Sequence, residues 1–185
     1  MPITVTFDDQ EVLAVLKRIA DSFTPAGMRG AMAEIGEELA ESTRKRFATS
    51  TGPDGSPWEP LKEGTVLARY QKMIDDFGQG NFKKDGSLSR RGEGRAAKAA
   101  AAAKTPLVDT GALSRSINFQ ITDGGAGVEI GPNRTFDESK GVGPEVHQFG
   151  TRNGRIPARP FLGLSANDKT TVLDILNELL ADAVK

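Results

Sequence analysis

Pro157 and Pro160 constrain the fold of this chain more than any other feature, because they enclose Arg159 on both sides. Proline fixes φ, and a residue before a proline avoids the helical region, so the backbone here is predicted to be extended. Three apolar residues follow Pro160 closely, namely Phe161, Leu162 and Leu164. The stretch therefore combines a fixed arginine with a core anchor, which is typical of a structural contact rather than a reaction centre.

The composition excludes several classes of protein. The chain has 185 residues, enough for one domain, and its formal net charge of −1 gives no general attraction to nucleic acid or to an anionic membrane. Without cysteine it has no disulfides, and a single histidine, His147, excludes most multi-histidine metal sites. We expect no signal peptide, because no basic region followed by an apolar core stands in the first residues, and no run approaches the ~20 apolar residues of a membrane-spanning helix. We therefore expect the protein in a cytoplasm or packed into a larger particle.

Helical periodicity dominates the first part of the chain and returns at its end. One helix is predicted to begin near Asp8, and a long one at Thr24–Pro25, where proline is tolerated. A third is predicted from about Lys62 to Ile74, and Ser165 with Asp168 predicts the start of the last. The apolar stripes are Val12, Val15, Leu16, Ile19 and Phe23; Met28, Met32, Ile35, Leu39 and Phe47; and Val172, Ile175, Leu176, Leu179 and Ala183.

Alternating apolar and polar residues predict three short strands. The first contains Ile3, Val5 and Phe7. The other two flank Asp123–Gly125, a predicted hairpin turn, and contain Ile117, Phe119, Ile121, Val128 and Ile130. The predicted class is α+β, with a helical N-terminal half packed on a small antiparallel sheet and a C-terminal helix.

The segment from Gly78 to Lys104 has seven lysines and arginines against two acidic residues. Gly78–Gly94 is predicted to be a mobile loop, because it cannot bury enough apolar surface to offset its ordering entropy, and Ala96–Lys104 a short helix. We interpret residues 78–104 as a flexible basic insertion in a single domain spanning residues 1–185. The segment is either a solvated loop or a contact to DNA phosphates, with three candidate side chains, Arg90, Arg91 and Arg95.

Other positions each allow two interpretations. His147 is a structural or interface residue, or a general base that would need an orienting carboxylate and a nucleophile or metal. Asp109 with Gly111 indicates a helix cap before a turn, or a metal or phosphate site. Trp58 clamps its Pro/Gly loop onto the helices or anchors a partner. Arg159 contacts another subunit or forms a salt bridge within the fold.

Three blocks in this order resemble the phage virion morphogenesis, or tail completion, proteins of Mu-like phages. The first is Phe47 followed by Gly52–Leu61, and the second is Leu107–Ile117, which includes the Asp109–Gly111 turn. The third is His147–Thr151 with Ile156–Ser165. Their spacing resembles that family over most of the chain, apart from the segment 78–104.

The resemblance implies a structural protein of the virion tail or neck, present in the host cytoplasm during assembly. It implies a role in tail completion and head–tail joining, as a ring of copies, hexameric, beside the head–tail connector and the tail terminator or tail tube. Genomic DNA in the channel would be a non-specific contact. No enzymatic activity, cofactor or metal is expected. We expect structural or interface roles for five residues: Trp58, His147, Phe149, Arg159 and Phe161. The alternatives are a stopper or tail terminator, a DNA-binding regulator, or a nuclease.

Overall fold

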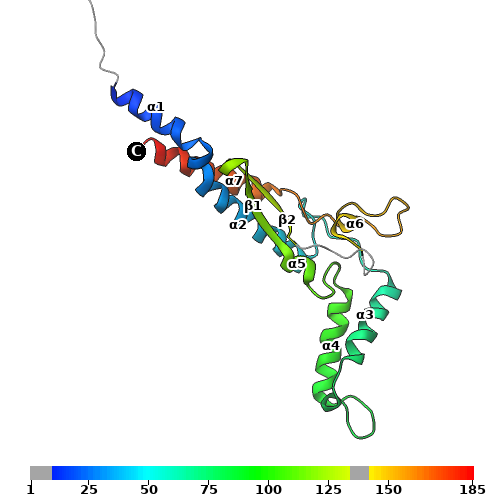
Figure 1. Cartoon of the computed structure of the whole chain (residues 1–185). Coiled ribbons are helices and arrows are strands. Elements are labelled where there is room, and N and C mark those ends of the chain that lie inside the picture. Colours follow the sequence, from blue (N-terminus) through cyan, green and yellow to red (C-terminus); the bar gives the residue numbers. More distant parts are fainter. Residues whose placement is uncertain (1–9, 134–141) are drawn as a thin grey trace, which may run out of the picture. The chain divides into compact units, whose positions relative to one another are not determined.

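The computed structural model describes residues 10–133 and 142–185. In this part of the chain, helices are combined with a single two-stranded antiparallel sheet, which confirms the predicted α+β class. The predicted strand with Ile3, Val5 and Phe7, and the helix start at Asp8, lie outside the described residues. The elements are α1 (Gln10–Ser22), α2 (Pro25–Thr49), α3 (Glu63–Asp75), η1 (Gln79–Asn81), α4 (Arg90–Lys104), α5 (Ala112–Ser116), β1 (Ile117–Thr122), η2 (Asp123–Gly125), β2 (Gly127–Pro132), α6 (Pro144–Phe149) and α7 (Ala166–Ala183) (Figure 1).

The chain divides into two compact units. Unit 1 combines the chain up to Ser42 with Asn118–Asn133 and Leu164–Lys185. Unit 2 combines Thr43–Ile117 with Arg134–Gly163. The division falls inside the long helix α2, so one continuous helix supplies residues to both units. The single-domain boundary at residues 1–185 stays a prediction.

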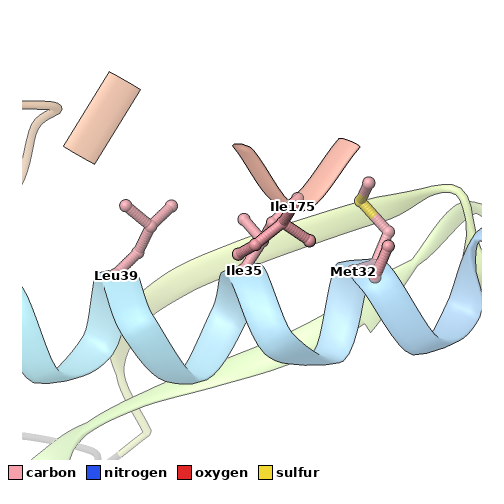
Figure 2. Packing of buried hydrophobic residues seen from close by; sticks show 5 residues of the cluster. Met32, Ile35, Leu39 and Ile175 are labelled. Carbon is pink, nitrogen blue, oxygen red and sulfur yellow. The ribbon is translucent and has the colours of Figure 1, made fainter. Parts of the chain in front are cut away.

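The core of unit 1 lies where α2 meets α7. Met32, Ile35 and Leu39 project from successive turns of α2, and Ile175 of α7 packs against them (Figure 2). Val128 and Ile130 of β2 pack on the same cluster. The apolar stripes predicted for α2 and α7 therefore form this core, because residues three or four apart share one helix face.

The β-hairpin of unit 1 packs on α2 where that helix has glycine in place of a larger side chain. A Cβ at Gly36 would overlap the ring of Phe119 from β1, so the absence of a side chain allows strand and helix to approach closely. The predicted turn is also found, with Gly124 at φ +69° between β1 and β2. Here the left-handed backbone requires a residue without a Cβ penalty.

Helix α7 begins as the sequence predicts and pairs with α1. The Ser165 side chain accepts the Asp168 backbone N–H, and the Asp168 carboxylate accepts the Ser165 backbone N–H, forming a capping box. Helices α1 and α7 are in contact, and Nε of Arg18 donates to the carbonyl of Ala183 at 3.2 Å. On α1 the side chains of Val12 and Leu16 stay exposed.

In unit 2, α3 and α4 lie side by side as a helical hairpin (Figure 1). Helix α3 closely matches the prediction from Lys62 to Ile74. The loop prediction for Gly78–Gly94 is wrong at its end, because α4 begins at Arg90 rather than Ala96. The Ser89 hydroxyl caps that start by accepting the Gly92 N–H, and small residues then pack the helix closely: Gly92, Ala96, Ala99 and Ala103 are buried.

Candidate interface site around Phe149

Three aromatic side chains, all anticipated in the sequence, form the core of unit 2. The Phe47 ring from the end of α2 meets Trp58 edge-on, with ring centroids 5.5 Å apart, and lies 5.4 Å from Phe161 at a tilt. Trp58 is buried, and its Nε1 donates to the Pro160 carbonyl at 2.8 Å. This geometry is that of a clamp, in which Trp58 fastens the Pro/Gly loop to the extended segment before Phe161.

Arg159 is buried inside unit 2, and its side chain binds backbone. Its Nε donates to the Glu59 carbonyl at 2.7 Å, and its Nη2 donates to the Pro60 carbonyl at 3.0 Å. These bonds lie within the fold, but to backbone carbonyls rather than to the carboxylate of a salt bridge, and a contact of Arg159 with another subunit stays a prediction. The extended backbone imposed by Pro157 and Pro160 is what aims the guanidinium at the 59–60 loop.

The sequence analysis predicted neither helix α6 nor the role of Gln148, whose side chain holds this helix in place. The Gln148 Oε1 accepts the backbone N–H groups of Phe161 and Leu162, each at 3.0 Å, and its Nε2 donates to the Leu162 carbonyl at 3.0 Å. The Arg159 backbone N–H also donates to the His147 carbonyl at 2.7 Å. The available signal was weak, since a lone glutamine after a proline start is common in loops.

Phe149 projects from this fixed helix into solvent, with 78% of its surface exposed. Gly150 ends the helix at φ +76° and ψ 178°, a conformation that is essentially restricted to glycine. A Cβ at Gly150 would stand 2.8 Å from the Ala158 backbone nitrogen, so the turn also needs the space. A large apolar side chain is thus held outward by a backbone that has little freedom to turn it inward.

His147 lies on the other side of α6, partly buried. Burial lowers the pKa of His147, and the positive charges of Arg159 and Arg69 lower it further, while Glu145 acts in the opposite direction. Its Nδ1 has no hydrogen-bond partner among the described residues. A general base needs an orienting carboxylate, and among the described residues Nδ1 is bonded to none. The structural or interface role of His147 stays a prediction.

A pocket of about 350 Å³ opens beside His147. The Arg69 Nε lies 3.9 Å from Oδ1 of Asp109, which is half exposed at the lining. Of the predicted cap residues 109–111, Gly111 holds the N-cap position of α5 at φ +70°, and no side chain forms a cap hydrogen bond there. The Thr110 hydroxyl accepts the Ala112 backbone N–H at 3.3 Å. Among the described residues, the lining is Arg69, Leu107, Asp109, Thr110, Gly111, Ala112, Leu113, Val142, Pro144 and His147.

The three candidate DNA contacts lie at the start of α4. Arg90 and Arg91 are exposed in its first turn, and the Arg95 guanidinium lies 4.5 Å from the centre of the Phe77 ring. Arg95 therefore has a structural partner as well as a charge. Positive charge in the first turn opposes the helix dipole, so Arg90 and Arg91 gain no stability from their position on the helix.

No cluster of three or more histidine or acidic side chains able to hold a metal ion occurs in residues 10–133 and 142–185. In the same ranges, no helix has the length and apolar character needed to span a membrane.

Comparisons with known proteins give a consistent assignment. A family model described as the phage virion morphogenesis family matches residues 7–90 and 87–181. The two matches meet inside the basic segment 78–104. Mu-like prophage FluMu G protein 2 of Haemophilus influenzae is 34% identical over 86 residues, covering 44% of this chain. The match covers 56% of that relative, little more than half its length. No solved structure matches.

Proposed function

Because the chain belongs to the phage virion morphogenesis family, we propose that it acts in tail completion and head–tail joining, as one copy in a ring at the neck of a tailed phage. The family itself gives the chain a structural role in virion morphogenesis. The finer role, the neck location and the absence of enzymatic activity are parts of the proposal.

The observation that carries this proposal is the exposed, fixed side chain of Phe149. An aromatic side chain that is 78% exposed on a backbone held by Gln148 and ended by Gly150 loses little conformational freedom when it is covered. Aromatic anchors of this kind contribute strongly to protein–protein binding. The site therefore supports non-covalent assembly.

The proposed partners are further copies of the chain and the proteins on either side of the ring. A ring requires a heterologous contact, in which two different surfaces of each copy meet and the rotation between copies closes. We propose a hexamer that contacts the head–tail connector on one side and the tail terminator or tail tube on the other.

A second part of the proposal concerns DNA in the channel of the ring. The segment 78–104 carries seven basic and two acidic residues, and Arg90 and Arg91 are exposed at the start of α4. Lysine and arginine bind DNA through phosphate neutralisation and counterion release, without reading sequence. A non-specific contact to passing genomic DNA fits this surface.

Electron microscopy of particles from a phage that lacks this gene tests the joining role. We expect filled heads and separate, otherwise complete tails, with joining restored by wild-type protein supplied from a plasmid. Normal intact virions would overturn the proposal and favour the regulator or nuclease alternatives, which nuclease and gel-shift assays would then separate. Tails of abnormal length would favour a tail terminator, and heads that lose their DNA would favour a stopper.

The contact with DNA is tested by Arg90→Gln combined with Arg91→Gln. These side chains are exposed, so the double variant is expected to fold normally but to bind DNA more weakly and with a shallower salt dependence. Arg95 is left intact because it lies on Phe77. The matched control is Arg29→Gln, an exposed arginine outside the basic segment. Unchanged DNA binding and infectivity of the double variant would contradict the contact.

A further inference from the structure

Helix α6 presents two different surfaces on opposite sides. Pro144 and His147 line the pocket, whereas Phe149 points to solvent. Successive residues of an α-helix are separated by ~100° around its axis, which places His147 and Phe149 ~200° apart. One short, fixed helix thus carries an apolar projection on one side and one wall of a pocket on the other.

The pocket has the size and the chemistry to receive an aromatic side chain. Its volume of about 350 Å³ falls at the lower end of the range for small-molecule sites, which exceeds the needs of one phenyl ring. Its apolar walls come from four residues: Leu107, Leu113, Val142 and Pro144. Arg69 also lines it, and a guanidinium binds favourably over the face of an aromatic ring.

We infer that Phe149 of one copy inserts into the pocket beside His147 of the next copy, so that α6 is the contact between neighbours in the ring. This inference rests on the proposed ring and names its contact. The two surfaces differ and lie on opposite sides of one element, which is what a heterologous contact requires and what a two-fold symmetric dimer does not provide.

The charges around the two surfaces are complementary as well. Arg152 and Arg155, both exposed, follow Phe149 in the next turn of the chain. The pocket offers the carboxylate of Asp109, which is 50% exposed and lies 3.9 Å from Arg69. A neighbouring arginine near this rim would find a partly free carboxylate, which favours one orientation of the two copies.

One inserted phenylalanine buries much less surface than the ~800 Å² per partner of a stable pairwise interface. Free copies are therefore expected to associate weakly, and the contact is expected to form where the assembling particle concentrates them. The test must consequently be carried out during phage assembly rather than in dilute solution alone.

The experiment replaces Phe149 with p-benzoylphenylalanine in the phage-encoded protein and irradiates infected cells. We expect covalent dimers and higher multimers of the chain, with mass spectrometry placing the cross-link at Arg69, in residues 105–115 or in residues 142–147 of the second copy. The control carries the same probe at Leu67, which is 61% exposed in the same unit but far from α6 in sequence. Val142 is an exposed residue at the mouth of the pocket, so Val142→Trp is expected to block the pocket. The yield of cross-links from position 149 should then fall to the yield from the control probe at position 67.

Cross-links from position 149 to another protein, to another part of the chain, or to no second copy would overturn the inference. The gene deletion tests the joining role, whereas the cross-linking experiment tests the α6 contact, so the two can fail separately. Separated heads and tails without a cross-link between copies would leave the joining role in place and reject the α6 contact. Intact virions from the deletion would reject the joining role itself.

Discussion

Arg159 stabilises unit 2 by supplying donors to the carbonyls of Glu59 and Pro60, which lie in an irregular loop. The Arg159 side chain is buried, and a buried charged donor without acceptors is costly, so these two carbonyls satisfy the guanidinium. The rigid fork of a guanidinium reaches two such groups at once, which a lysine ammonium on a flexible stem does less well. Arg159 therefore contributes to the stability of unit 2.

The substitution Arg159→Lys is expected to lower the free energy of unfolding by about 1–3 kcal/mol, because one of the two carbonyls loses its donor. Urea unfolding followed by fluorescence of Trp58, the single tryptophan in the chain, measures the change. The matched control is Arg155→Lys at an exposed position nearby. Its free energy of unfolding is expected to change by no more than about 0.5 kcal/mol. Equal effects at both positions would contradict a structural role for the Arg159 guanidinium.

His147 makes the stability of the protein depend on pH in a narrow range. Burial, aided by Arg159 and Arg69, holds the folded pKa of His147 below its ordinary value of 6.5, so the unfolded chain takes up the proton first as the pH falls. The contribution of the neutral ring is fully present above the unfolded pKa, and it is lost as the pH falls through 6.5 toward the folded pKa.

The substitution His147→Gln is expected to remove this component of the pH dependence. Urea unfolding at constant ionic strength between about pH 7 and about pH 5.5 should show a steeper loss of stability for the wild type than for the variant. This range lies above the ordinary titration of most carboxylates, which would otherwise obscure the difference. Parallel curves for the two proteins would rule out a depressed pKa at His147.

At the scale of elements, the α3–α4 hairpin depends on small residues rather than on large apolar ones. Helix α4 buries Gly92, Ala96, Ala99 and Ala103, and the last three contribute only methyl groups. Because these side chains are small, α4 can pack closely against α3 and η1. The close packing offsets the small apolar area that each residue buries. A composition that suggests disorder in isolation is therefore compatible with a packed helix.

Two glycines of α4 are expected to respond in opposite directions to substitution by alanine. At Gly92 an added Cβ would overlap the backbone carbonyl of Asn81, so Gly92→Ala should destabilise the protein by about 1–3 kcal/mol. At Gly94 there is open space, so Gly94→Ala should stabilise it by about 0.5–1 kcal/mol through helix propensity alone. Thermal unfolding of both variants checks the pair. Stabilisation by both would mean that η1 does not pack on α4.

At the scale of the whole molecule, the α6 contact predicts how defective copies complement one another. Phe149→Ser removes the inserted side chain, and Val142→Trp blocks the pocket, so neither variant is expected to self-associate even at high concentration. A mixture retains one competent pair of surfaces and should give a 1:1 heterodimer that grows no further. Sedimentation velocity of each variant, of the mixture and of the wild type measures this. Larger assemblies in the mixture, or no heterodimer at a protein concentration at which the wild type associates, would contradict a heterologous contact.

The sequence alone determined the features that depend on local chemistry. The periodicities of α2 and α7, the approximate bounds of α3, the capping box of Ser165 and Asp168, and the hairpin turn follow from residues close together in the chain, and the structure agrees with each. Phe47 and Phe161 were also recognisable as core residues, Phe47 from the apolar stripe of α2 and Phe161 from its place directly after Pro160, whereas the burial of Trp58 was one of two open interpretations. The order of three sequence blocks also indicated the family, and the comparisons confirm this assignment.

Only the tertiary structure decided which groups meet across long separations in sequence. Arg159 binds carbonyls about a hundred residues away, and Gln148 holds α6 through the backbone of Phe161 and Leu162, two partnerships that carry no signal in composition or spacing. The early start of α4 belongs here as well, because neighbouring elements cover its small residues. A propensity describes one segment by itself, whereas burial and hydrogen-bond partners belong to the arrangement of all segments in a unit.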